Sequence, residues 1–253
     1  MVSTSNDLVL KHQLQPLSWA QEALEFHPDE RQTAVLLENP NRLLLNCTRQ
    51  WGKSTTTAAK ALYRALRHRQ HLVIALSPSA RQTGELMRKI EDFVKRCGIT
   101  PRNDGDNEMS LVFGNGSRIV GLPGTDGTIR GFSSVNLMII DEASRVNEAS
   151  YRAARPMLAV GLGDLMCMST PFGKRGFFYE EWTNGGTAWT RVRVPASECP
   201  RISKEFLAGE RASLGDMWFR QEYGCEFMDT QDQLFSHELI EGALDTDLVP
   251  IFG

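Results

Sequence analysis

Short apolar runs alternate along the chain with longer segments in which apolar residues recur at three- and four-residue steps. Apolar runs of this length between turn-forming residues are typical of buried strands. Strands are expected at residues 42–47, 71–76, 135–140, 164–169 and 189–194. Residues 109–113 and 117–122, joined by Gly114–Gly116, are expected to form a hairpin.

The segments between the strands have the period of amphipathic helices. Helices are expected at residues 18–26, 29–37, 54–69, around 86–94, 147–155 and 202–223. Ser18–Gln21 and Asp29–Gln32 have the form of capping boxes, in which the first and fourth residues exchange side-chain and backbone hydrogen bonds. Gly121–Gly131, rich in Gly, Thr and Asp, is expected to be an exposed loop.

The alternation of strands and helices predicts an α/β fold whose mostly parallel sheet is covered on both faces. The helical segment after about Pro200 is expected to form a small lid subdomain at the edge of the sheet. We therefore divide the chain into a core with an N-terminal helical lead-in, residues 1–199, and a helical lid, residues 200–235.

Composition changes this picture little. The chain has 253 residues, of which 41% are hydrophobic and 23% are charged, as in ordinary globular proteins. A net charge of −3 neither indicates nor excludes nucleic-acid binding, because a local basic loop can act within an acidic whole. The five cysteines lack zinc-ligand spacing and are expected to be reduced thiols. The chain shows neither a secretory signal nor an apolar run of membrane-spanning length, so we expect a cytoplasmic protein without a membrane partner.

The clearest chemical motif follows the first expected strand. Residues 45–54 run from the strand end through a loop to Gly52, Lys53 and Ser54, where a helix begins. This layout points backbone N–H groups and the positive end of a helix dipole at an anion. In such a phosphate loop Lys53 reaches the β- and γ-phosphates, and the Ser54 hydroxyl binds Mg²⁺. Cys47 stands where the usual pattern has its first Gly, which weakens the match to the general motif.

A second motif, residues 137–142, ends in two adjacent carboxylates. Four apolar residues bury the strand, and Asp141 and Glu142 emerge at its C-terminal end, where open α/β sheets bind ligands. Asp141 is expected to hold the Mg²⁺ shell, and Glu142 to polarise the attacking water. The plain alternative is a strand end solvated by two acids. The position of the pair after the phosphate loop favours the catalytic interpretation.

The two motifs together indicate ATP as the nucleotide. A strand-end Glu that acts as a base suits ATP-driven motors rather than switch GTPases. The sequence also contains no Asn-Lys-x-Asp segment of the kind that selects guanine. We therefore expect a P-loop NTPase domain of the ASCE, RecA-like type that uses ATP with Mg²⁺.

Several segments together resemble the large terminase subunit of tailed bacteriophages, the ATP-driven motors that package DNA into capsids. The segments that follow in the family's order are Pro28–Gln32, Leu44–Thr55, Ser77–Gln82, Ile129–Gly131, Asp141–Glu142 and Ser169–Pro171. The resemblance runs from about Pro28 to Phe235, and its joint pattern is specific although each motif alone is weak. The family's phosphate loop carries Arg-Gln before Gly-Lys, as Arg49 and Gln50 do here, so Cys47 counts less against the site.

The resemblance implies roles for individual residues. Those expected to bind ATP are Gln32, Arg49, Gln50, Trp51, Gly52, Lys53, Ser54 and Thr55. The expected catalytic residues are Arg49, Lys53, Arg130 and Glu142. Gln32 resembles the family's adenine-reading glutamine, with a capping-box partnership to Asp29 as the alternative. Arg49 is expected to stabilise transition-state charge from within the subunit. Arg130 resembles an arginine finger offered to a neighbouring subunit, with an exposed loop arginine as the alternative.

Ser169, Thr170 and Pro171 resemble the family's coupling motif, which passes hydrolysis on to movement. Their place at the end of a strand puts small hydroxyls beside the expected γ-phosphate, although any strand-end turn has a similar sequence. Lys174 and Arg175 follow this motif. They are candidates for contact with DNA phosphates, and a solvated charge pair is an equal alternative.

The resemblance also implies partners. They are double-stranded DNA, other copies of the chain in a ring, the portal and the small terminase subunit. Large terminases usually carry a C-terminal nuclease domain, and only a short stretch follows Phe235. Residues 236–253 are therefore expected to begin a linker, and the chain is expected to be an ATPase fragment that does not cut DNA.

Two other functions stay open on the sequence alone. A helicase-like nucleic-acid translocase shares these motifs, but usually needs a second motor domain. A nucleotide-binding module that scarcely hydrolyses ATP is the other alternative. It describes an isolated monomer, in which Arg130 has no neighbour to act on.

Overall fold

One mostly parallel sheet organises the part of the chain that the computed structural model describes, residues 15–103, 105, 109–124 and 131–229. Its order is β3-β4-β2-β5-β6-β1-β7. The strands are β1 (Arg42–Cys47), β2 (Leu72–Ser77), β3 (Ser110–Val112), β4 (Arg118–Pro123), β5 (Leu137–Asp141), β6 (Asp164–Ser169) and β7 (Thr190–Val194). The β3–β4 hairpin is antiparallel, and the other paired strands run parallel, which confirms the expected sheet.

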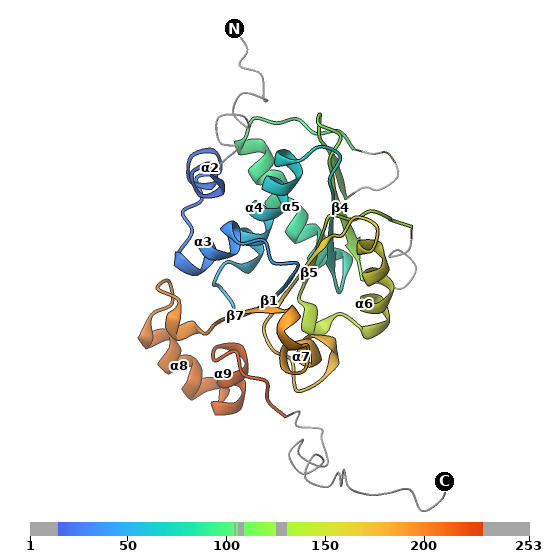
Figure 1. Ribbon diagram of the computed structural model, residues 1–253. Coiled ribbons are helices and arrows are strands. Elements are labelled where there is room, and N and C mark those ends of the chain that lie inside the picture. Colours follow the sequence, from blue (N-terminus) through green and yellow to red (C-terminus); the bar gives the residue numbers. More distant parts are fainter. Residues whose placement is uncertain (1–14, 104, 106–108, 125–130, 230–253) are drawn as a thin grey trace, which may run out of the picture.

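Helices cover both faces of this sheet. In Figure 1, α4 and α5 lie on one side of it and α6 on the other. The helices are α2 (Pro16–Ala23), α3 (Glu30–Leu37), α4 (Lys53–Arg67), α5 (Ala80–Arg96), α6 (Glu148–Ala154), α7 (Gly176–Thr183), α8 (Lys204–Leu214) and α9 (Asp216–Glu222). Short 3-10 turns are η1 (Ala143–Arg145), η2 (Arg155–Leu158), η3 (Gly186–Ala188) and η4 (Ala196–Glu198).

Strand β1 shows how the apolar runs divide between the two faces. Leu43 and Leu45 belong to the core under α2 to α5, whereas Leu44 belongs to the core under α6 and α7. Successive side chains of a strand point to opposite faces, so a strand buried on both sides must be apolar throughout. This explains why the central strands appear in the sequence as unbroken apolar runs.

The parallel register sets the carboxyl ends of three neighbouring strands level with one another. Asn46 of β1 pairs with Ser169 of β6, and Met168 of β6 pairs with Asp141 of β5. On the other side of β1, Cys47 pairs with Val194 of β7. The loops that follow these strands therefore meet along one edge of the sheet.

The first helix begins differently from the prediction. The capping box expected at Ser18–Gln21 is wrong, because α2 starts at Pro16 and Gln15 is its N-cap residue. Proline suits the first helical position, since its φ is preset and its missing N–H has no helical acceptor there. Ser18 instead donates from Oγ to Oε1 of Gln15 at 3.0 Å.

Two further segments differ from the expected pattern. Helix α7 is not among the expected elements, and the loop expected from Gly121 onwards begins later, because residues 121–123 belong to β4. The helix expected at residues 202–223 is divided at Gly215, whose φ of +79° favours glycine. The result is a pair of helices, α8 and α9, that extends beyond β7 (Figure 1).

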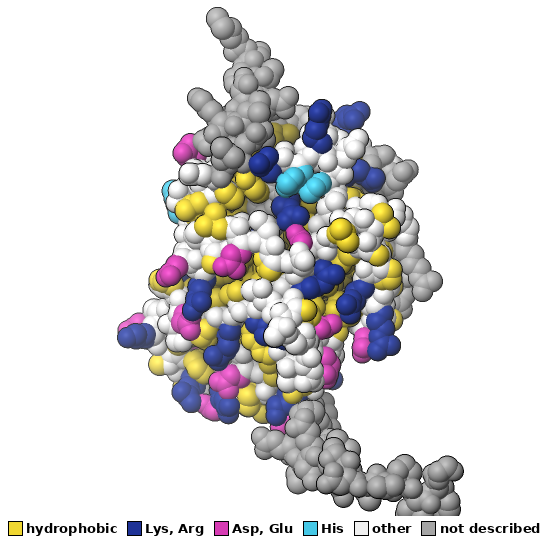
Figure 2. Space-filling view, in the orientation of Figure 1, with side chains coloured by type: hydrophobic (Ala, Val, Ile, Leu, Met, Phe, Trp, Pro, Cys, Tyr) yellow, Lys and Arg dark blue, Asp and Glu magenta, His cyan; other side chains and the backbone are white. Residues whose placement is uncertain are grey.

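Several general expectations can be compared with the structure. All five cysteines are free thiols, as predicted, and all five are buried. None of the helices in the described part of the chain is both long and apolar enough to cross a membrane. Basic and acidic side chains are mixed on the face that Figure 2 shows. The boundaries of the lid stay a prediction, and residues 230–253 lie outside the described part.

We expect Leu-to-Ala substitutions to cost much more unfolding free energy in the buried central strands than at exposed positions. Leu45→Ala removes a fully buried side chain from β1, so we expect it to lower the free energy of unfolding by about 2–5 kcal/mol. Leu162→Ala is the matched control, because Leu162 is 89% exposed and its loss should cost less than about 0.5 kcal/mol. Urea denaturation measures both variants. Equal costs at the two positions would contradict this description of the core.

Candidate functional site

The loop between β1 and α4 presents an uncapped helix N-terminus. Helix α4 starts at Lys53 after Gly52, and neither a capping side chain nor an acidic first-turn residue meets its free N–H groups. Those groups and the helix dipole favour an anion at this position. Gln50 has a φ of +65° and Gly52 a φ of +94°, so the loop turns twice through the left-handed region. The expected phosphate loop therefore has the backbone geometry of an anion cradle.

Lys53 lies inside this loop rather than on the surface. Its side chain is buried, and Nζ donates to the carbonyl oxygens of Cys47 at 2.7 Å and Thr48 at 2.9 Å. These two bonds hold the ammonium between the end of β1 and the start of α4. The cation is thus positioned before any phosphate arrives, and its third N–H is available to a ligand.

Gln32 joins the start of α3 to the phosphate loop. Its Oε1 accepts from the backbone N–H of Asp29, whose side chain accepts in turn from the Gln32 N–H, which confirms the capping box. Gln32 Nε2 donates to the carbonyl oxygen of Trp51 at 2.7 Å. Both ends of the amide are therefore engaged, and the adenine contact stays a prediction that requires one of these bonds to open.

Three other residues expected to bind ATP differ in which of their groups a ligand can reach. The indole of Trp51 is only 1% exposed and belongs to the hydrophobic core, so this residue presents its backbone alone to a ligand. Ser54 and Thr55 lie in the first turn of α4. Ser54 is the nearer of the two to the helix start, where an oxygen ligand for a phosphate-bound Mg²⁺ is needed.

The two carboxylates lie at the end of β5. Asp141 is 7% exposed, and its burial, followed by the neighbouring charge of Glu142, raises the pKa of its carboxyl to about 6. The positive charge of Lys53 opposes that rise, which shows that the two motifs are electrostatically close. Glu142 has a φ of +49°, a strained value for a residue with a side chain. The strain turns its backbone N–H toward Asp141 Oδ1, at 2.9 Å.

Polar atoms without partners gather along this carboxyl edge. In the described part of the chain, four buried oxygens there accept or donate no hydrogen bond: Asn46 Oδ1, Ser77 Oγ, Glu142 Oε2 and Thr170 Oγ1. They follow or end β1, β2, β5 and β6. Buried polar groups are nearly always paired, so a row of unpaired oxygens marks a place for water or a polar ligand.

The expected coupling residues touch the turn that follows the carboxylates. Ser144, in η1, shares a hydrogen bond of 2.7 Å between its Oγ and that of Ser169, and it donates to the carbonyl oxygen of Thr170 at 2.9 Å. Ser169 and Thr170 are buried, and Pro171 follows them at the same edge. One serine therefore joins the turn after β5 to the end of β6.

Arg49 points away from the phosphate loop. Its Nε donates to Glu222 Oε2, in α9, at 2.7 Å, and this bond raises the pKa of the guanidinium. Arg145 approaches both carboxylates, with its Nε 3.8 Å from Glu142 Oε2 and its Nη2 3.8 Å from Glu222 Oε1. The guanidinium of Arg145 also lies 4.1 Å from the ring centre of Phe172. Neither Glu222 nor Arg145 belongs to a recognisable sequence motif, so the sequence analysis did not identify them as part of the site.

Arg201 is a further residue that sequence reasoning missed. Its Nη2 donates to the carbonyl oxygen of Trp51 and lies 3.4 Å from Asp29 Oδ2. The side chain therefore closes the phosphate loop from the β7–α8 connection. Lys174, a candidate DNA contact, is paired instead with Asp229 Oδ1 at 3.4 Å.

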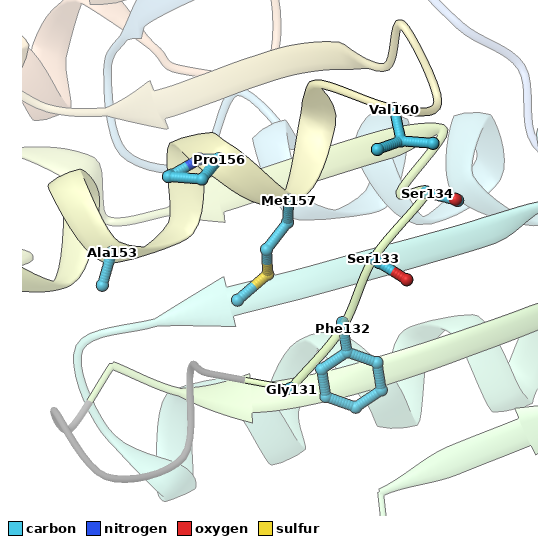
Figure 3. Close-up of a pocket in the computed structure, with 8 residues that line it drawn as sticks. All are labelled: Gly131, Phe132, Ser133, Ser134, Ala153, Pro156, Met157 and Val160. Atoms are coloured by element: carbon cyan, nitrogen blue, oxygen red, sulfur yellow. The ribbon is translucent and has the colours of Figure 1, made fainter.

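Arg130 lies outside the described residues, directly before Gly131 in the chain. Gly131 lines a hollow of about 220 Å³ between the segment that leads into β5 and η2. Figure 3 shows Phe132 and Met157 beside this hollow, with Ser134 and Val160 at its far end. None of the residues expected to bind ATP lines it. This hollow is therefore separate from the phosphate loop.

The residues at the carboxyl edge suit Mg²⁺. This ion prefers oxygen ligands and usually combines one or two protein groups with phosphate oxygens and water. The hydroxyl of Ser54 and the carboxylate of Asp141 are such a pair. In the described ranges no group of three or more His, Cys, Asp or Glu side chains could hold a metal by itself. A hydroxyl and a carboxylate suit a metal whose other ligands are phosphate oxygens and water.

Comparisons with known proteins agree on one family. Residues 44–241, more than half of the chain, match the family described as "Terminase large subunit, T4likevirus-type, N-terminal". The large subunit of the terminase of Thermus virus P23-45 is 24% identical over 85% of this chain and 52% of its own length. The chain therefore spans about half the length of the curated relatives it matches.

Solved structures share the fold. The ATPase domain of the large terminase of Thermus phage P74-26 superposes with a TM-score of 0.73 and 21% identity, over 85% of this chain and 100% of that chain. The large terminase of a thermophilic bacteriophage in complex with ADP gives a TM-score of 0.63 and 14% identity, over 86% of this chain and 53% of that chain. At these identities the likeness establishes the fold alone.

The geometry of the phosphate loop predicts that two Gly-to-Ala substitutions change the free energy of unfolding in opposite directions. In Gly52→Ala the new Cβ meets Gln32 Nε2 at 2.9 Å and the φ of +94° is unfavourable, so we expect a loss of about 1–3 kcal/mol in unfolding free energy. Gly84→Ala is the control, because Gly84 lies in α5 with open space around its Cβ position, and should gain about 0.5–1 kcal/mol. Chemical denaturation measures the unfolding free energy of both variants. A stabilised Gly52→Ala protein would refute the geometry of the loop.

Proposed function

The chain belongs to the T4likevirus-type terminase large subunit family, and we propose that it is the ATP-hydrolysing motor domain that drives double-stranded viral DNA into a capsid. One observation carries the proposal: the uncapped start of α4, Lys53 and the carboxylates after β5 meet at the carboxyl edge of a parallel sheet. That edge is where open α/β sheets bind nucleotides.

The residues of this edge divide the work of phosphoryl transfer. Lys53 and the backbone N–H groups of the loop bind the β- and γ-phosphate oxygens and neutralise their charge. Ser54 and Asp141 would hold Mg²⁺, which supplies further charge neutralisation when it is bound with ATP. The γ-phosphate is then fixed between the start of α4 and the end of β5.

Glu142 activates the attacking water. Its Oε2 is buried and accepts no hydrogen bond from the described residues, so it is free to accept one from a water molecule. The carboxylate takes a proton from that water as the water oxygen attacks the γ-phosphorus, while the bond from this phosphorus to the β–γ bridging oxygen breaks and ADP leaves with that oxygen. Arg145, whose Nε lies 3.8 Å from the same oxygen, places a positive charge beside the base.

The arginines complete the charge balance. Arg49 stabilises the transition state from within the subunit, and Arg130 does so in a neighbouring subunit. Ser169, Thr170 and Pro171 pass loss of the γ-phosphate on to movement, a role supported by the Ser144 bridge between β5 and β6. The site of one chain is then complete only in a ring.

Further partners follow from the family. We propose double-stranded DNA, the portal and the small terminase subunit as partners, with assembly in the cytoplasm of the host cell.

Gln32 is proposed to read adenine after its bond to Trp51 opens. Residues 200–235 form the proposed lid, and residues 236–253 the start of a linker. Lys174 and Arg175 are left out of the DNA-binding proposal, because Lys174 is paired and Arg175 lies 4.8 Å from the ring centre of Phe172.

Two substitutions test the chemistry. Lys53→Ala removes the phosphate-binding cation and Glu142→Gln removes the base, so each should lower steady-state phosphate release from ATP by at least about 100-fold. The controls are Lys95→Ala and Glu148→Gln, which alter exposed residues whose ion-pair partners, Asp92 and Arg152, lie outside the site, and they should leave turnover unchanged. Circular dichroism verifies that every variant folds. Undiminished hydrolysis in both site variants would disprove the assignment.

Mixing of inactive variants tests the role of Arg130. If Arg130 acts in a neighbour, then Arg130→Ala mixed with Glu142→Gln restores part of the activity, because some sites pair an intact base with an intact finger. Hydrolysis per subunit should also rise with protein concentration. Turnover that stays constant with dilution to monomers, together with no recovery in the mixture, would refute the trans role and favour action within one subunit.

A further inference from the structure

The carbonyl oxygen of Trp51, in the phosphate loop, has two side-chain donors. Gln32 Nε2 donates to it at 2.7 Å from α3, and Arg201 Nη2 donates to it from the connection between β7 and α8. A carbonyl oxygen has two lone pairs, so both of its acceptor positions are filled. One of the two donors can therefore leave while the oxygen keeps a partner.

This carbonyl needs a donor because it cannot turn to solvent. Trp51 is buried as a whole, and its indole belongs to the hydrophobic core. Its neighbours on both sides, Gln50 and Gly52, have φ values of +65° and +94°, which leave the loop little freedom to rotate the peptide. A buried carbonyl that loses every donor is costly, whereas a carbonyl that keeps one of two donors is not.

Arg201 reaches the loop from a fixed turn. Cys199 is buried, and its N–H donates to the carbonyl oxygen of Ala196 at 3.1 Å. Ile202, next to Arg201 in the chain, donates from its N–H to the carbonyl oxygen of Cys199 at 3.0 Å and packs against the core under α2 to α5. The guanidinium of Arg201 is thus carried by an anchored backbone.

The same connection also contacts the first residues of α3. Arg201 Nη2 lies 3.4 Å from Asp29 Oδ2, while Asp29 Oδ1 caps the helix by accepting from the Gln32 N–H at 2.8 Å. Arg31 of α3 and Glu198 of the connection form a second ion pair at 3.5 Å. Arg201 therefore has contacts that hold it beside the Gln32 amide even when this amide leaves Trp51.

The Gln32 amide has the groups that the edge of an adenine requires. Its Oε1 keeps a second lone pair beside the bond from the Asp29 N–H, and this lone pair can accept from the amino group of the base. Nε2 can donate to a ring nitrogen after it leaves Trp51. Nε2 lies only 2.9 Å from the position of a Cβ at Gly52, so such a base would lie beside the start of α4.

We propose that Arg201 is a positioning residue for base recognition: it holds the Trp51 carbonyl alone while Gln32 turns its amide from that carbonyl to an adenine. The inference rests on the proposed function, in which Gln32 reads adenine. Without Arg201 the same turn would leave a buried carbonyl unpaired, and Gln32 would stay on the loop. Selection of adenine then depends on a residue that does not touch the base.

A double-mutant cycle tests the shared carbonyl without nucleotide. Gln32→Met and Arg201→Met each leave the Trp51 carbonyl one donor, whereas the double variant leaves it none. Urea denaturation should therefore give the double variant an unfolding equilibrium constant about tenfold higher than the product of the two single effects, the cost of one unpaired buried carbonyl. Single effects that simply multiply would overturn the proposal.

Two controls identify the source of this coupling. Arg31→Met combined with Gln32→Met should give effects that multiply, because Arg31 reaches the connection through Glu198 and not through the carbonyl. Asp29→Ser keeps a helix cap but removes the carboxylate that faces Arg201. The coupling between Gln32 and Arg201 should persist in this background. Its loss there would assign the coupling to the ion pair and overturn the proposal.

Two nucleotides test the effect on base recognition. ADP and purine riboside 5′-diphosphate differ only in the amino group, which is a hydrogen in the second, and calorimetry with Mg²⁺ gives the Kd of each. The unaltered chain should prefer ADP about tenfold, and Arg201→Met should lose most of this preference, as Gln32→Met does. Arg201→Lys, which keeps a donor and the charge, should retain it, and so should Arg31→Met.

The outcomes separate this proposal from a merely structural role and from failure of the proposed function. If Arg201→Met weakens both nucleotides equally and leaves the preference for ADP intact, the role is structural and the proposal is overturned. Equal affinities in the unaltered chain would overturn it as well, and would leave the ATPase assignment standing. Binding of neither nucleotide would contradict the ATPase assignment, and the cycle without nucleotide would still decide whether the two side chains share the carbonyl.

Discussion

Parallel pairing of β5, β6 and β1 is the constraint on which the site depends. The register sets Asp141, Met168, Ser169 and Asn46 level at the carboxyl edge, so everything that follows these strands meets there. The uncapped start of α4 supplies positive potential at that edge, and Lys53 adds a cation held by two carbonyl oxygens. The buried carboxylate of Asp141 lies beside it, and in the described part of the chain unpaired buried oxygens lie along the same edge, where water or a polar donor can supply the missing partners.

The helical pair also contacts this edge. The end of α9 and the chain after it share hydrogen bonds with β1 and with the chain after β6, and Glu222 joins Arg49 to Arg145.

Sequence reasoning succeeded where local chemistry decides structure. Unbroken apolar runs identified the central strands, and Asp29 with Gln32 formed the predicted capping box. It failed where distant contacts decide. Ser18 looked like a helix cap, but Pro16 begins the helix. The partnership of Glu222 with Arg49 joins residues far apart in the chain, and no spacing rule connects them. Trp51 belonged to an expected ATP-binding stretch, yet its indole is in the core, because motif position does not reveal side-chain direction.

The most direct measurement is a structure of the chain with Mg²⁺ and a non-hydrolysable ATP analogue. We expect a γ-phosphate between Lys53 and Glu142 and a metal held by Ser54 and Asp141. A nucleotide bound elsewhere, with Lys53 still held by Cys47 and Thr48 alone, would contradict the site.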